Sequence, residues 1–208
     1  MIIPKQQINS AKKILVSAQC YLQKFIKFPD IGIFHSYAEL LHAALLESNQ
    51  LVNSFIPQPC KTIINGRRYI PDCYVTFSNK REVIELKPAG KFNDAHFAPL
   101  SEFFNSELDA KFKVITNEEI FAQEQKALNW LFIIRVLVNN AHEATDNQEC
   151  QLIKLLSDKP EQNLGDLIQI GNRMNSSLQE LALFRLIHKG QVSINNDKEI
   201  DLNTEVSL

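Results

Sequence analysis

The chain has 208 residues, and 45% of them are hydrophobic, which is enough for a folded core and too much for a disordered chain. Its 22 Lys and Arg residues nearly balance its 24 Asp and Glu residues, so the net charge of −2 singles out no class of partner. No apolar run reaches the roughly 18 residues of a membrane span, and the first residues lack the apolar core of a signal peptide. We therefore expect a cytoplasmic protein with no membrane partner.

The N-terminal segment is basic. The first 29 residues hold five Lys residues and no acidic residue, and residues 10–27 predict a basic helix or an arm that contacts DNA or a protein partner. A second helix is predicted over 36–48, where Ser36 and Glu39 form the S-x-x-E capping pattern.

Strands dominate the next part of the chain. Residues 61–66 and 67–77 predict a hairpin that turns near Asn65-Gly66, and residues 82–86 predict another strand after a polar turn. Helices and strands then alternate: a helix over 99–111, a strand over 112–116, and a long helix over 117–138 with a second capping pattern at its start. This order predicts a mixed α/β domain in which helices pack on a sheet.

A polar segment over 139–149 predicts a linker, so we expect one domain over 1–140 and a second over 141–208. In the second domain the sequence predicts three helices, over 149–158, 163–171 and 176–190, and then a small hairpin over 191–202. This order is typical of winged helices. The first domain has a charge balance of +3 and the second of −5. The acidic second domain, including its tail at 199–208, is better suited to a protein partner than to DNA phosphates.

Charged residues stand among apolar ones between residues 71 and 87. Side chains two apart share one face of a strand, so Glu85 and Lys87 point the same way. If the strands over 67–77 and 82–86 pair, Asp72 reaches the level of Glu85, and a hard divalent cation such as Mg²⁺ would relieve the repulsion between the two carboxylates. The spacing alone also fits a solvated strand face with a Glu–Lys pair.

The segment RYIPD (68–72) followed by IELKP (84–88) resembles the PD-(D/E)xK nuclease superfamily, and more specifically the TnsA family, the endonuclease subunit of heteromeric cut-and-paste transposases. SYAE (36–39), PQP (57–59) and FKVITNEEI (112–120) match further family segments in the same order. The resemblance implies a restriction-endonuclease-like core with a small C-terminal winged-helix-like domain.

The resemblance also implies roles for individual residues. Asp72 and Glu85 would be metal ligands and Lys87 the catalytic lysine. Glu39 would be the helix-borne acid that completes the site as a further metal ligand, although it also fits a plain capping role. The cofactor would be Mg²⁺, with Mn²⁺ as a substitute. The partners would be DNA at the transposon ends, a DDE-type transposase and an AAA+ ATPase regulator.

Two other functions fit the same residues: a stand-alone nuclease of restriction or repair type, and a non-catalytic assembly module with a nuclease-like core. Further side chains are weaker site candidates, since each also fits a structural or surface role: Gln58, Lys91, His35, His42 and Trp130. The four Cys residues are scattered without a C-x-x-C pair, so we expect neither a zinc site nor a disulfide framework.

Overall fold

The computed structural model describes residues 4–8, 20–168 and 173–208, and for Asp94 and residues 173–175 it describes the backbone alone. The chain divides into two compact units, Met1–Glu124 and Gln125–Leu208. Among the described residues, no helix combines the length and the apolar character needed to cross a membrane.

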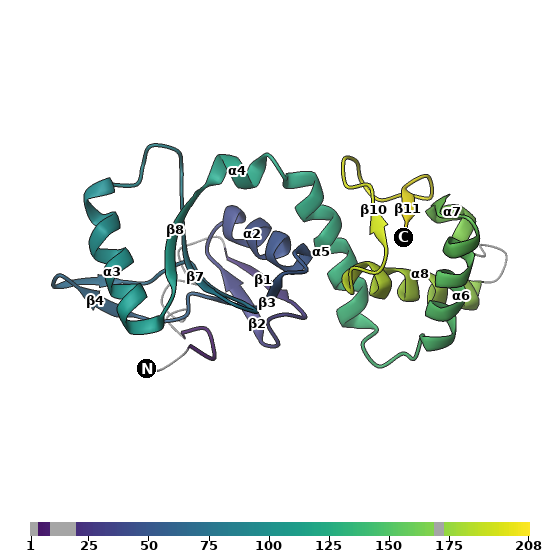
Figure 1. Ribbon diagram of the computed structural model, residues 1–208, viewed down its shortest axis with the longest axis horizontal. Helices are drawn as coiled ribbons and strands as arrows, with labels where there is room; N and C mark the ends of the chain where they lie inside the picture. Colours follow the sequence, from purple (N-terminus) through teal and green to yellow (C-terminus); the bar gives the residue numbers. More distant parts are fainter. Residues whose placement is uncertain (1–3, 9–19, 169–172) are drawn as a thin grey trace. The chain divides into compact units, whose positions relative to one another are not determined.

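A four-stranded mixed sheet forms the centre of the N-terminal unit (Figure 1). Its strands are β3 (Val52–Pro57), β6 (Cys73–Phe77), β7 (Arg81–Lys87) and β8 (Lys111–Thr116), in that spatial order. The first two pairs are antiparallel and the β7–β8 pair is parallel. Helix α2 (Tyr37–Ser48) packs on β3 and helix α3 (Phe97–Leu108) packs on β8, so the mixed α/β prediction is confirmed.

Alternation of side chains explains why these residues form this sheet. On β7, Ile84 and Leu86 are buried on one face, while Glu85 and Lys87 share the other. At the edge of the unit, β1 (Tyr21–Lys24) and β2 (Ile31–Phe34) form an antiparallel pair. Of the predicted basic helix or arm over 10–27, the structure describes residues 20–27, which contain strand β1 and no helix. Residues 9–19 lie outside the described part.

The predicted hairpin over 61–77 forms only in part. Strands β4 (Thr62–Ile64) and β5 (Arg67–Tyr69) pair around Asn65 and Gly66, which both adopt positive φ as a tight hairpin turn requires. The pairing then stops before Pro71, which has no N–H to donate to a ladder. Beyond Pro71 the chain enters the main sheet as β6, so the predicted strand over 67–77 is two strands.

The predicted long helix over 117–138 is also two elements. Thr116 and Glu119 form the predicted capping box at the start of α4 (Asn117–Phe121). The amide of Gln123 then donates to the Ile120 carbonyl three residues back, a tightened turn that separates α4 from α5 (Glu124–Asn139).

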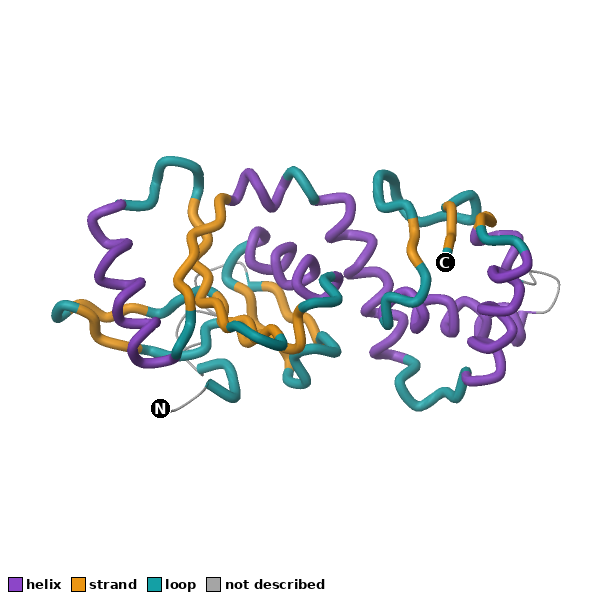
Figure 2. The backbone as a smooth tube through the Cα atoms, viewed as in Figure 1, coloured by secondary structure: helices purple, strands orange, loops and turns teal. Residues whose placement is uncertain are grey.

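The C-terminal unit is mostly helical (Figure 2). It contains α5, α6 (Asp146–Asp158), α7 (Leu164–Leu167), α8 (Arg173–His188) and a three-stranded antiparallel sheet of β9 (Glu161–Asn163), β10 (Ser193–Ile194) and β11 (Glu205–Ser207), with β11 in the middle. Helix α5 buries Trp130, Ile133 and Ile134, and its Phe132 ring contacts Phe184 of α8. The division at Glu124 thus places α5 with this unit, before the polar segment where the sequence suggested a boundary.

Two details of this unit differ from the sequence expectation. The hairpin predicted over 191–202 takes its second strand from 205–207, because Asp201 and Thr204 close a turn through the Asp201 amide and the Thr204 hydroxyl, 2.8 Å apart. The acidic tail therefore supplies the central strand of the sheet. Strand β9 was not expected, and the predicted helix over 163–171 is described only up to Ile168, with α7 ending at Leu167.

Candidate functional site

Asp72 lies between β5 and β6 and is held from two sides. Its Oδ2 atom accepts a hydrogen bond from the Leu86 amide at 2.7 Å, and its carbonyl oxygen accepts one from the Gln58 amide at 2.9 Å. These bonds attach Asp72 to β7 on one side and to the end of β3 on the other. The carboxylate is thus fixed at the centre of the sheet.

Glu85 and Lys87 meet on one face of β7. The ammonium of Lys87 lies 2.6 Å from Oε1 of Glu85, and the hydroxyl of Tyr69 donates to Oε2 at 2.5 Å. Glu85 is only 5% exposed, so its charge depends on these two partners. Because of the ion pair, the pKa of Lys87 is raised, although burial alone would lower it.

The pairing of β6 with β7 brings Asp72 and Glu85 together. Cys73 pairs with Ile84, which places the preceding Asp72 level with Glu85, as the sequence predicted. Burial and the neighbouring charge of Glu85 together raise the pKa of Asp72 to about 7, against the lowering effect of the hydrogen bond from the Leu86 amide. Two carboxylates held this close favour a shared cation.

Glu39 approaches the same place from α2. It completes the predicted cap, since the Ser36 hydroxyl donates to Oε1 and the His35 amide donates to Oε2, each at 3.1 Å. Its carboxylate raises the pKa of Asp72, and both residues border a small void of about 10 Å³. Burial raises the pKa of Glu39, while the charge of Lys87 lowers it. Glu39 therefore caps α2 and also lies close to Asp72.

In the part of the chain that the structure describes, no group of three or more His, Cys, Asp and Glu side chains is arranged to hold a metal ion. Both oxygens of Glu85 and both oxygens of Glu39 already have donors. The donor chemistry still fits Mg²⁺, which prefers carboxylate oxygens and takes only one or two of them. Asp72 and Glu85 are two neighbouring carboxylates of this kind.

Gln58 is closer to the site than its sequence signal suggested. It is buried and adopts a φ of 42°, which is uncommon for a residue other than glycine. Its side-chain nitrogen lies 2.5 Å from Nδ1 of His35, whose Nε2 is buried with no hydrogen-bond partner among the described residues. Gln58 and His35 thus connect the end of β3 to the cap that holds Glu39.

The remaining candidates separate into core and surface. His42 is buried in α2, and burial lowers its pKa to about 4, so it is a neutral core residue. Trp130 is buried in the C-terminal unit, and Lys91 is exposed beside Lys87. Sequence reasoning missed Tyr69 as a contact of Glu85. The spacing along the short strand predicts only that Tyr69 shares a face with Arg67.

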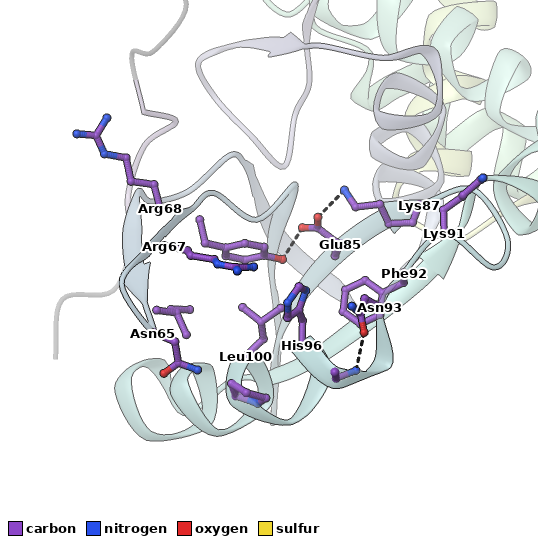
Figure 3. A pocket seen from close by; sticks show the side chains of 14 residues that line it. Asn65, Arg67, Arg68, Glu85, Lys87, Lys91, Phe92, Asn93, His96 and Leu100 are labelled. Carbon is purple, nitrogen blue, oxygen red and sulfur yellow. Dashed lines mark hydrogen bonds and ion pairs between the residues drawn. The ribbon is translucent and has the colours of Figure 1, made fainter.

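A cavity of about 510 Å³ opens beside Glu85 and Lys87 (Figure 3). Its walls come from the β4–β5 hairpin, the end of β7, the loop at 91–93, the short 3₁₀ helix Asp94–His96 and the first turn of α3. We call it the hairpin cavity. The proposed reacting groups therefore border a space large enough for a ligand.

The chain matches no model of a known protein family, and a search of curated proteins finds no match either.

Proposed function

We propose that the chain is a magnesium-dependent DNA endonuclease, acting as one subunit of a heteromeric transposase. It would hydrolyse phosphodiester bonds at transposon ends, in the strand that a partner DDE-type transposase leaves uncut, under the control of an AAA+ ATPase. The observation that carries the proposal is the placement of Asp72 against Glu85 and Lys87 by the β6–β7 pair.

The order of elements supports the same proposal. Helix α2, strands β3, β6 and β7, helix α3 and strand β8 follow one another in the order expected of a restriction-endonuclease-like core. The C-terminal order of α6, β9, α7, α8, β10 and β11 suits a winged-helix-like domain. These likenesses concern architecture, so the choice of reaction rests on the side chains.

In this proposal Asp72 and Glu85 would hold the cation, and Glu39 would complete the set of acidic side chains around it. When bound, Mg²⁺ would activate a water molecule and stabilise the charge that develops on the phosphate. Lys87 carries a raised pKa, so it stays protonated at neutral pH and acts through its positive charge and its N–H donors. Burial raises the pKa of Glu39, which favours the protonated form of its carboxyl group.

We expect Asp72→Ala and Lys87→Ala each to lower the cleavage rate at least about a hundredfold while the protein stays folded. The measurement is a strand-specific cleavage assay on transposon-end DNA with the partner transposase present, alongside circular dichroism. Lys80→Ala is the control, because Lys80 pairs with Glu82 at the other end of β7. Full cleavage by Asp72→Ala would rule out this mechanism.

A non-catalytic assembly module is the second candidate. The observation in its favour is that both oxygens of Glu85 are engaged by Tyr69 and Lys87. Calorimetry with Mg²⁺ and Mn²⁺ distinguishes the nuclease from the assembly module. A nuclease should bind the cation, and Asp72→Ala should abolish that binding. An assembly module should show no specific cation binding. Cleavage of naked DNA without any partner would instead point to a stand-alone nuclease.

A further inference from the structure

The hairpin cavity has a cationic lining. Arg67, Lys87 and Lys91 line it, and Arg68 borders it with a guanidinium that extends away from the other lining side chains (Figure 3). The carboxylate described in its wall is Glu85, which Lys87 already neutralises. Among the described residues, no carboxylate pairs with Arg67, Arg68 or Lys91. The cavity therefore carries positive charge that is available to an anionic ligand.

The side chains of the hairpin are directed differently. Arg67 and Tyr69 share one face of β5 and Arg68 takes the other, as alternation along a strand requires. Figure 3 shows Arg67 running inward, toward His96 and Glu85, while Arg68 extends away from them. Both arginines are exposed, so the direction of the side chain is what distinguishes them.

The hairpin is also joined to the proposed reacting groups. The Tyr69 hydroxyl donates to Glu85, and the Tyr69 ring contacts Phe104 of α3. A ligand that fills the cavity consequently lies directly against Glu85 and Lys87. The apolar part of the lining, which includes Phe92 and Leu100, suits the sugar portion of a nucleic acid better than a free inorganic anion.

We propose that the hairpin cavity receives the sugar–phosphate backbone of the DNA strand beside the bond that is cut, with Arg67 binding a phosphate on the hairpin side and Lys91 binding one at the opposite end. This inference rests on the proposed function, because a DNA substrate is what brings a phosphodiester to Lys87. Arginine suits the first position, since its planar fork binds two phosphate oxygens at once.

The test compares two neighbouring arginines in the full-length chain. Binding of a fluorescein-labelled DNA duplex is followed by fluorescence anisotropy at several salt concentrations, with EDTA present so that no cleavage occurs. We expect Arg67→Ala to weaken binding about tenfold and to reduce the slope of log affinity against log salt by about one. Arg68→Ala, the matched control, should stay within about twofold of the unaltered chain.

Equal effects of Arg67→Ala and Arg68→Ala, or no salt-dependent binding by the unaltered chain, would overturn the inference. Asp72→Ala separates this result from the proposed function. If Asp72→Ala binds the duplex normally and does not cut it with the partner present, both proposals stand. If Asp72→Ala still cuts, the catalytic proposal falls, while the comparison of Arg67 with Arg68 still decides the cavity.

Discussion

Two carboxylates near β7, the half-buried Asp72 and the buried Glu82, have opposite surroundings. Asp72 faces Glu85 and Glu39, and burial together with these charges raises its pKa. Glu82 is 4% exposed and lies 2.8 Å from the ammonium of Lys80 and 2.7 Å from that of Lys113. Burial alone would raise the pKa of Glu82, but the two lysines outweigh it and the pKa is lowered. The anionic form of Asp72 therefore destabilises the fold, and the anionic form of Glu82 stabilises it.

Replacing Asp72 should make the metal-free protein more stable. Its pKa is about 7 in the folded chain and 3.8 in an exposed one, so its contribution to stability is fully present below pH 3.8 and is lost as the pH rises through 7. Asp72→Asn keeps an acceptor for the Leu86 amide and removes the charge. We expect the free energy of unfolding at pH 8 to rise by roughly 2 to 4 kcal/mol, measured by urea unfolding in EDTA.

Glu82→Gln is the matched control for this experiment. It removes a buried charge that has two cationic partners, so the free energy of unfolding should fall, by roughly 1 to 2 kcal/mol because both lysines are partly exposed. A shift in the same direction for both variants would show that Asp72 is not held in an unfavourable site. The opposite shifts would identify Asp72 as kept for function at a cost in stability.

The site residues could be predicted from the sequence to the extent that they depend on local spacing. Alternation places Glu85 with Lys87, and antiparallel pairing brings Asp72 level with them. The contacts of Tyr69 and Gln58 were not predictable in this way. They depend on how β5 folds back over β7 and on the positive φ of Gln58, which no short pattern encodes.

At the scale of elements, the sequence predicts correctly those features that depend only on neighbouring residues, such as helix caps and tight turns. The Ser36 cap, the Thr116 capping box and the Asn65-Gly66 turn form as their sequences predict. The errors arose where tertiary pairing decides the outcome. Strand β9 has three polar residues and no apolar alternation, and it exists because β11 pairs with it.

The β4–β5 hairpin depends on its turn, because Gly66 adopts a φ of 76°. A Cβ atom added at Gly66 meets no atom within 4 Å, so the effect of Gly66→Ala is confined to backbone strain. We expect a loss of about 1 kcal/mol in hairpin stability, seen as faster amide hydrogen exchange at β4 and β5. Asn65→Gly relieves strain at a φ of 50° and should not speed exchange; equal acceleration in both variants would contradict this explanation.

For the whole molecule, the distribution of cations separates the roles of the two units. The N-terminal unit presents Arg67, Arg68 and Lys91 around a cavity. In the C-terminal unit, two described cations of α8 and its end are engaged internally: Arg185 donates to the Asn140 carbonyl and to the Thr145 hydroxyl, and Lys189 pairs with Glu149. That the acidic C-terminal domain binds a protein partner rather than DNA stays a prediction.

Arg185→Ala tests this division of roles. The guanidinium holds the segment between α5 and α6 against α8, so its loss should lower the free energy of unfolding of the C-terminal unit by roughly 1 to 3 kcal/mol. DNA affinity, measured by anisotropy in EDTA, should not change. Arg135→Ala is the control, because Arg135 is exposed and its recorded contact is with the Phe132 ring at 5.8 Å, worth about 0.5 kcal/mol. If Arg185→Ala weakened DNA binding with no loss of stability, α8 would be a DNA-contacting helix, and the assignment of DNA to the N-terminal unit alone would be wrong.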